Sequence, residues 1–374
     1  MENMGLIENS QILMYSLKPV FRNKTVLITG HTGFKGSWLA LWLHSLGARV
    51  CGYALPPPTT PGNFCLSKIA DIMSKHLTAD VRDFERLSGC LLKVRPDFIF
   101  HLAAQPLVRE SYRSPRDTFE TNVGGTVNLL EALRLAKRPC NVVVVTSDKC
   151  YENTGLKRGY GESDPMGGHD PYSASKGAAE IVIASYRSSF FNPKDCGRHG
   201  VKLASARSGN VIGGGDWATD RILPDCISAL TGGGKIIVRN PDAVRPWQHV
   251  LEPLSGYLLL AAGMAGKNGG EYCEAWNFGP SAKNARSVRE LVEKVIRQWG
   301  GGAWQKTGEK NAPHEAHYLT LCSRKANKLL GWKNIWGFER AVEKTVCWYK
   351  AWHNKNTDLQ NLCLAQIEEY CRRI

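Results

Sequence analysis

Three adjacent polar residues, Ser147, Asp148 and Lys149, follow closely on the valine run at 142–145. Such a run is typical of a buried strand, so these side chains should stand at the carboxyl end of that strand. A carboxylic acid and an amine placed side by side can protonate one atom of a substrate and deprotonate another. The string therefore indicates acid–base chemistry at the tip of a core strand.

Tyr172 and Lys176 form a second candidate pair, four residues apart at the start of an expected helix over 172–190. At this spacing they share one helix face, and an ammonium group lowers the pKa of a nearby phenol. Tyr172 could then accept a proton from a sugar hydroxyl. In a chain with 12 tyrosines the motif gains weight from its combination with Ser147, whose hydroxyl can bond the same substrate oxygen.

A glycine loop, GHTGFKG, places Gly30, Gly33 and Gly36 between an expected strand and an expected helix. Such a loop brings backbone close to a pyrophosphate, which the N–H groups of the helix N-terminus can bind. The second expected strand, at 48–55, ends without the acidic residue that usually holds the ribose 2′-hydroxyl. NAD and NADP both stay open, and Lys35 adds a cation that could accept a 2′-phosphate.

These residues must be positioned by a core, and the first half of the chain alternates between strands and helices. We expect strands over 25–30, 48–55, 97–104, 140–147 and 201–213, and helices over 37–47, 118–137 and 172–190. Apolar strands alternating with helices predict a parallel sheet covered on both faces, an α/β fold of the doubly wound Rossmann type. The last helix carries one predicted apolar face, formed by Ala178, Ile181, Val182 and Ser185.

The pattern changes after residue 213. Glycine-rich strings predict loops, and residues 287–300 predict an amphipathic helix with a single apolar face. That face consists of Val288, Leu291, Val292, Val295, Ile296 and Trp299. We expect a dinucleotide-binding domain over 22–212, joined by segments near 250–280. A smaller mixed α/β substrate domain should lie mainly over 213–350, and residues 1–21 should form an extension.

The composition limits the class of protein. The net charge of +14 suggests an anionic partner, and basic residues without long runs favour a nucleotide diphosphate over nucleic acid. The 12 cysteines show no zinc-ligand spacing, so we expect reduced thiols, no metal and a cytoplasmic protein. We see neither a secretion signal nor an apolar run of the roughly 18 residues that cross a bilayer, so we expect no membrane partner.

The strings TGHTGFKG, HLAAQ, TNVGGT, TSDK and YSASK resemble the extended short-chain dehydrogenase/reductase superfamily, over roughly residues 22 to 350. The strings SDKCYEN, LPPPTTP, RSGNVIGGGDW and RPWQHVLEPLSGY resemble the CDP-glucose 4,6-dehydratase branch of its NAD-dependent sugar epimerase/dehydratase family. The resemblance implies a tightly held, recycled NAD and a CDP-glucose substrate. CDP-glucose would become CDP-4-keto-6-deoxyglucose and water. Similar dTDP-glucose dehydratases carry Asp-Glu where Asp148 and Lys149 stand, and lysine is the residue expected in the CDP-glucose branch.

The resemblance also implies residue roles. Ser147, Tyr172 and Lys176 match the group that oxidises the sugar at C4, while Lys149 and Asp148 would serve as the C5 base and the C6 acid. The positions that match the cofactor side are Gly30, Thr32, Gly33, Phe34, Lys35, Gly36, Asp80, Val81, Leu102, Ala103, Ala104, Gln105, Asn122, Tyr172 and Lys176. Among them, Asp80 and Val81 would contact adenine. The positions that match the substrate side are Ser147, Asn210, Arg221, Arg245 and His249.

Other interpretations stay open. The substrate could be dTDP-glucose or GDP-mannose, and a nucleotide-sugar 4-epimerase or 4-reductase would need Tyr172 and Lys176 without the acid–base pair. A redox-sensing regulator of this fold should lack the Tyr–Lys pair. The helices at 118–137 and 172–190 would pack as a four-helix bundle in a homodimer, or in a dimer of dimers.

Overall fold

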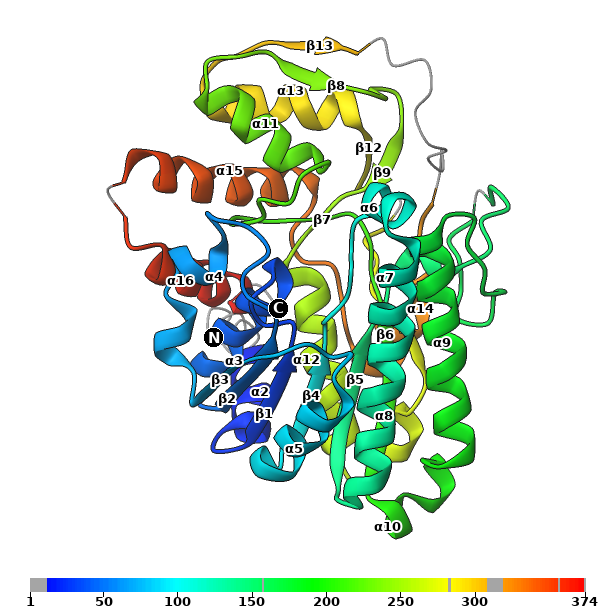
Figure 1. Ribbon diagram of the computed structural model, residues 1–374. Coiled ribbons are helices and arrows are strands. Elements are labelled where there is room, and N and C mark those ends of the chain that lie inside the picture. The colour runs from blue at the N-terminus through cyan, green and yellow to red at the C-terminus, as the bar shows by residue number, and fades with distance from the viewer. Residues whose placement is uncertain (1–11, 157, 282–283, 308–318, 356, 373–374) are drawn as a thin grey trace, which may run out of the picture.

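A seven-stranded parallel sheet forms the centre of the protein (Figure 1). The computed structural model describes residues 12–156, 158–281, 284–307, 319–355 and 357–372. The strand order is β11-β6-β5-β4-β1-β2-β3, which confirms the predicted α/β fold. The strands of this sheet are β1 Thr25–Thr29, β2 Arg49–Ala54, β3 Lys75–Thr78, β4 Phe98–His101, β5 Cys140–Val145, β6 Val201–Arg207 and β11 Ala275–Asn277.

Helices cover both faces of the sheet, because successive strand residues point to opposite sides and are apolar on both. Leu27 of β1 packs into one cluster with α5 and α8, whereas Val26 and Ile28 pack into the other with α3 and α12. The first layer consists of α5 Phe84–Val94, α8 Gly125–Ala136 and α9 Pro171–Ser189. The second consists of α2 Ile12–Phe21, α3 Phe34–Ser45 and α12 Leu251–Ala265.

Three expected elements differ from the observed ones. The strand predicted over 201–213 ends at Arg207 and resumes at β7 Val211–Ile212, because Asn210 adopts a left-handed conformation with φ 52°. The helix predicted over 118–137 begins at Pro115 and widens into a π-turn over Glu120–Gly124. The expected N-terminal extension contributes α2 to the fold, with Leu17 and Phe21 buried.

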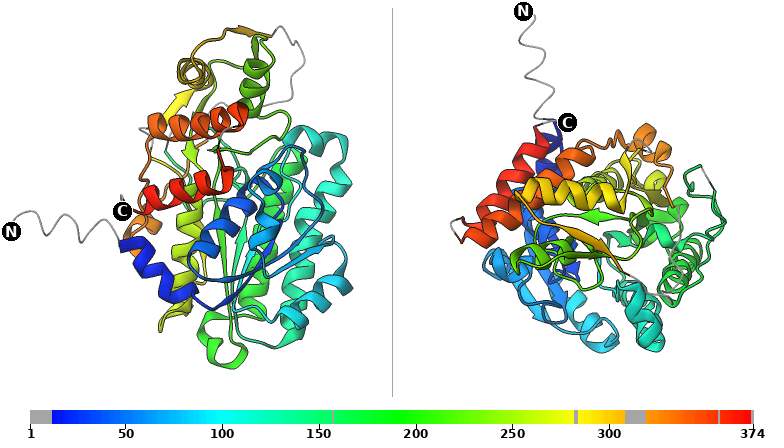
Figure 2. Two further views of the ribbon diagram at one scale, coloured as in Figure 1. Left: turned by 90° about the vertical axis from the view of Figure 1, so that its left-hand side faces the viewer. Right: turned by 90° about the horizontal axis from the view of Figure 1, so that it is seen from above.

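The remaining elements lie mostly above the carboxyl ends of the strands (Figure 1). The predicted amphipathic helix is confirmed as α13 Val288–Trp299, with Leu291, Val292 and Val295 buried. Figure 2 shows α16 beside α2, two helices that are in contact although they come from opposite ends of the chain. The helices outside the two layers are α4 Asn63–Leu66, α6 Val108–Arg113, α7 Pro115–Phe119, α10 Cys196–His199, α11 Ile222–Thr231, α14 Arg324–Leu330, α15 Phe338–Asn354 and α16 Leu359–Cys371. Of these, α10 lies at the opposite, amino end of the sheet (Figure 1). The short strands are β8 Ile236–Val238, β9 Val244–Pro246, β10 Gln248–His249, β12 Ala285–Ser287 and β13 Trp304–Lys306. Within the described ranges, we find no helix with the length and apolar character that a bilayer crossing requires.

Candidate active site

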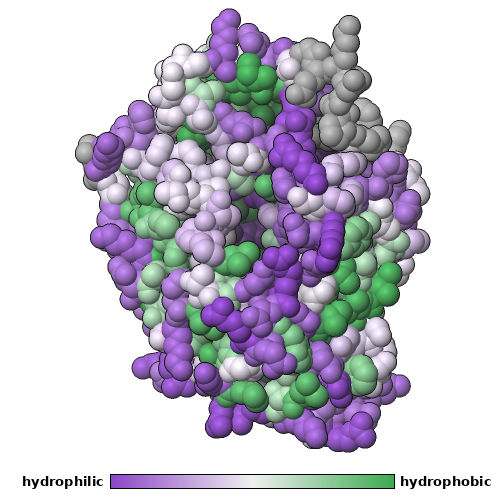
Figure 3. All heavy atoms as spheres, viewed as in Figure 1, coloured by the Kyte–Doolittle hydropathy of each residue, from purple (hydrophilic) through white to green (hydrophobic). Residues whose placement is uncertain are grey.

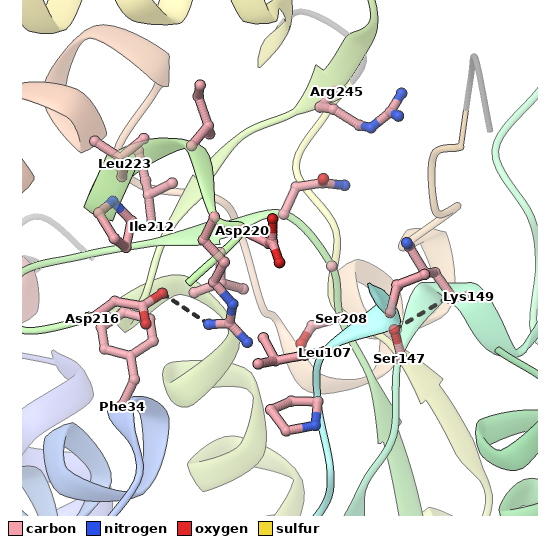
Figure 4. Close-up of a pocket in the computed structure, with 18 of the residues that line it drawn as sticks. Phe34, Leu107, Ser147, Lys149, Ser208, Ile212, Asp216, Asp220, Leu223 and Arg245 are labelled. Carbon is pink, nitrogen blue, oxygen red and sulfur yellow. Dashed lines mark hydrogen bonds and ion pairs between the residues drawn. The ribbon is translucent and has the colours of Figure 1, made fainter. Parts of the chain in front are cut away.

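A cavity of about 310 Å³ opens between the carboxyl ends of the strands and the elements above them. In parallel α/β sheets, ligands bind at this edge. Ser147, Asp148, Lys149 and Tyr172 all line the cavity. Figure 4 shows Ser147 and Lys149 on one side and Phe34 and Asp216 on the other. The structure therefore brings Asp148 and Lys149 into one pocket with Ser147 and Tyr172, whereas Lys176 lies behind the cavity wall and is buried.

Ser147 lies between the two candidate pairs, next to Asp148 of one and near Tyr172 of the other. It caps a short 3-10 turn at Asp148–Cys150 by accepting a hydrogen bond from the Lys149 backbone N–H at 3.2 Å. Its hydroxyl donates to Asp148 Oδ1 at 3.1 Å, and Ser147 lies close enough to Tyr172 to lower the pKa of that phenol. The turn thus points three neighbouring side chains of the strand end toward the same space.

Asp148 is buried, and burial raises the pKa of its carboxyl above the usual value, against the opposing effects of Lys149, Ser147, Lys35 and Arg245. Its carboxylate lies against Gly209, where a Cβ would come within 1.8 Å of Asp148 Oδ2. A raised pKa favours the protonated acid, which is the form in which this group can donate a proton.

Tyr172 and Lys176 are both buried on the first turns of α9. Burial raises the pKa of Tyr172 to about 12, and Asp148 adds to the rise while Ser147 and Arg221 oppose it. The expected lowering of the Tyr172 pKa by Lys176 is therefore wrong for this structure, because burial dominates and the groups that oppose it are Ser147 and Arg221. Burial lowers the pKa of Lys176 itself to about 8.

A buried ion pair lies one helical turn beyond Lys176. Arg207 donates to Glu180 at 2.8 Å, and Glu180 also accepts hydrogen bonds from Thr146 and Ser205. These partners hold the pKa of Glu180 below its usual value even though burial works to raise it. The network ties α9 to the ends of β5 and β6 and so fixes the position of Lys176.

The glycine loop forms a close-packed cradle at the end of β1. Gly30 has φ 76°, and a Cβ there would lie 2.6 Å from the backbone nitrogen of Ala103. A Cβ on Gly36 would lie 2.2 Å from the Gly30 carbonyl oxygen. With Gly33 capping α3, the backbone can approach a pyrophosphate closely at the N-terminus of that helix. The loop therefore fits a dinucleotide.

Lys35 does not point toward β2, and its expected place beside a ribose 2′-phosphate is corrected. Its side chain lines the catalytic cavity and donates to Ser208 Oγ at 2.9 Å. Burial lowers the pKa of Lys35 to about 7, with Arg221 acting in the same direction. From the first turn of α3 this side chain reaches Ser208, just after β6, and its amine therefore lies near Asp148.

The other cofactor-side residues lie around the same end of the sheet. Asn122 is buried and bonds both the N–H and the carbonyl of Gln105, and it donates to Ser175 at 2.9 Å. It therefore holds the loop after β4, which includes Leu102, Ala103 and Ala104. Asp80 is engaged by Arg82, Val81 packs against Gly125, and Thr32 donates to the Leu55 carbonyl.

Four of the five predicted substrate-side residues line the cavity: Ser147, Asn210, Arg221 and Arg245. Arg221 donates to the buried carboxylate of Asp216 at 2.8 Å. The predicted substrate-side role of His249 is wrong, because this residue lies in the core between Trp38 and Trp336 and not among the cavity residues. Burial lowers the pKa of His249 to about 3, which keeps the ring neutral.

Sequence reasoning missed several residues of the cavity wall. Ser208 and Asp216 lie inside the string RSGNVIGGGDW and could have been found there. Arg109, Asp220 and Arg239 carry no local signal, since they come from separate segments that only the fold brings together.

Comparison with known proteins agrees with this geometry. The sequence model of the family described as GDP-mannose 4,6 dehydratase matches residues 27–345. The chain is 51% identical over 336 residues to the CDP-glucose 4,6-dehydratase of Salmonella typhimurium, covering 90% of this chain and 93% of that one. A dTDP-glucose 4,6-dehydratase from Streptomyces venezuelae, solved with NAD, superimposes with a TM-score of 0.74 at 25% identity over 90% of this chain and 99% of that one. A UDP-glucose 4-epimerase from Brucella ovis shares the fold, with a TM-score of 0.72 at 22% identity over 87% and 98% of the two chains. The chain therefore belongs to the GDP-mannose 4,6 dehydratase family.

Proposed function

We propose that this protein converts CDP-glucose to CDP-4-keto-6-deoxyglucose and water, with NAD as a recycled cofactor. The observation that supports this proposal most directly is that Asp148 and Lys149 share one cavity with Ser147 and Tyr172. A 4-epimerase or 4-reductase needs only the second group, whereas elimination also needs an acid and a base at C5 and C6.

The cofactor fits the glycine cradle, with the pyrophosphate on Gly30, Gly33 and Gly36 at the N-terminus of α3. Bound NAD would supply a hydride acceptor for C4 and later a hydride donor for C6. Oxidised nicotinamide carries a positive charge, which lowers the pKa of a phenol next to it. NAD is favoured over NADP because Lys35 points into the catalytic cavity and away from the end of β2.

In the oxidation step, Tyr172 would take the proton from the C4 hydroxyl. The Ser147 hydroxyl lies near Tyr172 and lines the same cavity, so it can hold the same substrate oxygen. Lys176 lies buried one turn along α9 from Tyr172, at the position that the resemblance gives to the third member of this group. Their shared burial excludes water from the proton transfer.

In the elimination step, a 4-keto group makes the C5 proton acidic. Lys149 would remove that proton, and Asp148 would protonate the departing C6 hydroxyl. The raised pKa of Asp148 suits a group that must hold a proton before it donates one.

We also propose a homodimer or a dimer of dimers. Among the described residues, α7, α8 and α9 with its C-cap expose four large apolar side chains: Phe119, Leu135, Ile181 and Phe190. Ile181, predicted on an apolar face of α9, is 62% exposed, whereas Val182 of the same predicted face packs against the sheet, so only part of that face is free for an interface. Figure 3 shows apolar surface over α8 and α9, as a packed helical interface requires.

Two further proposals concern the location of the protein and the division of the chain into domains. We propose that the protein works in the cytoplasm, with its cysteines as free thiols, and that its basic charge serves nucleotide diphosphates and not nucleic acid. Residues 22–212 with 250–280 would bind the dinucleotide, and 213–350 would mainly bind the nucleotide sugar. In support, α12 and β11 pack in the first unit.

Incubation with CDP-glucose, dTDP-glucose, UDP-glucose and GDP-mannose, followed by mass spectrometry, tests the proposal. We expect loss of one water only from CDP-glucose. Loss of water from another sugar nucleotide alone would reassign the substrate, and a product of unchanged mass would refute the dehydratase function.

A further inference from the structure

A cluster of charged side chains occupies the cavity wall formed by α6, the start of α11 and β8. Arg239 donates to Asp220 Oδ1 at 2.7 Å, and Arg109 Nε lies 3.7 Å from the same oxygen. The three side chains keep between 25% and 29% of their surface exposed, and all line the cavity. They are therefore packed together yet still accessible from the cavity.

The backbone at Asp220 is unusual. Its φ of 61° places a non-glycine residue in the left-handed region, just before α11 begins. Such conformations cost free energy and often occur where a side chain must be aimed at a ligand. Asn210, on the opposite stretch of the cavity wall, is the other left-handed non-glycine residue among the described lining residues.

The charge of this cluster is close to balanced. Asp225, one turn into α11, lies near both arginines, so two carboxylates face two guanidinium groups. A phosphate would gain little from a cluster that is already neutralised, whereas a neutral polar ring would be recognised by its hydrogen bonds. Apolar walls for such a ring stand alongside, from Leu107, Ile222 and Leu223.

We infer that Asp220 and Arg239 read the edge of the substrate's nucleobase and select cytosine over uracil and thymine. This inference rests on the proposed function for the sugar nucleotide. A carboxylate only accepts hydrogen bonds and a guanidinium only donates them. Cytosine matches that order, with its N4 amino group as donor beside the N3 acceptor.

The geometry also explains rejection of the other pyrimidines. Arg239 Nη1 and Arg109 Nε both contact Oδ1, and Arg239 Nη2 donates to the Asp220 backbone carbonyl at 3.4 Å. Among the described residues, Oδ2 is therefore the carboxylate oxygen that would accept the N4 proton. Uracil and thymine present an O4 acceptor there, and two acceptors facing each other lose a hydrogen bond in a partly desolvated site. Asp220 thus discriminates between the bases, and Arg239 fixes the orientation of the Asp220 carboxylate.

Binding of CDP and UDP, measured by calorimetry, tests the inference without catalysis. The wild-type protein should bind CDP roughly ten- to a hundredfold more tightly than UDP. Asp220→Asn can turn its amide to donate to O4, so its preference for CDP should fall to within a few-fold. Asp242→Asn is the matched control, since Asp242 forms a similar Asp–Arg pair at 3.2 Å but is exposed outside the cavity. It should keep the wild-type ratio.

A wild-type ratio in Asp220→Asn, with both affinities unchanged or equally weakened, would overturn the inference and leave the cluster a structural role. If that variant does not fold, wild-type protein can be tested with CDP and with its N4,N4-dimethyl derivative, which has no N4–H donor. Equal affinity for the two would also overturn it. A failed dehydratase function is recognised separately, because then no sugar nucleotide loses water whatever the binding ratio.

Discussion

Gly209→Ala should disable dehydration while sparing oxidation at C4. The added methyl carbon would lie 1.8 Å from Asp148 Oδ2 and 2.0 Å from its Cγ, against 3.4 Å for ordinary contact. The carboxyl group or the loop at 208–210 must therefore shift by roughly 1.5 Å. Misplacement of a reacting group by about 1 Å can cost on the order of a hundredfold in rate.

The assay separates the two steps. Reduced-cofactor absorbance after mixing with CDP-glucose reports oxidation, and mass spectrometry reports loss of water. We expect oxidation within a few-fold of wild type and dehydration lower by about a hundredfold. Gly89→Ala is the control, since a Cβ at Gly89 meets no atom within 4 Å and the substitution favours α5. Wild-type dehydration by Gly209→Ala would refute the role given to Asp148.

Two further predictions concern other residues. Lys149→Met should retain oxidation at C4 and abolish loss of water, because it removes the C5 base. Full dehydration by this variant would contradict the assignment of Lys149 as that base. Burial raises the pKa of Glu252 from 4.5 to about 7, so the native state keeps a proton that the unfolded chain has lost between those values. The free energy of unfolding should therefore fall by about 3 kcal/mol as pH rises from about 4.5 to beyond 7, since each pKa unit is worth about 1.4 kcal/mol. Glu252→Gln, which keeps an acceptor for Ile335 and Trp336, should lose this fall in urea unfolding at pH 5 and pH 8. An equal pH dependence in both proteins would contradict the assignment.

Most of the fold can be predicted from local sequence patterns. The glycine loop, the valine strand before Ser147 and the amphipathic helix at α13 are each set by neighbouring residues, and the structure contains all three. The break after Arg207 was missed because alternating apolar residues continue on both sides of it.

Side-chain direction was harder to predict. Lys35 lies in a cofactor motif, yet its four-carbon stem reaches Ser208 on another strand. His249 lies in a substrate-like string, yet the fold turns it between two tryptophans. The pairing of Asp220 with Arg239 depends on packing of α11 against β8, which no spacing in the sequence encodes.

Reaction of CDP-glucose in deuterium oxide tests the central claim most directly, because only elimination across C5 and C6 exchanges the C5 proton with solvent. We predict a product that has lost one water and carries one deuterium at C5, located by NMR and mass spectrometry. A product without deuterium at C5, whether epimerised or merely oxidised at C4, would contradict the account.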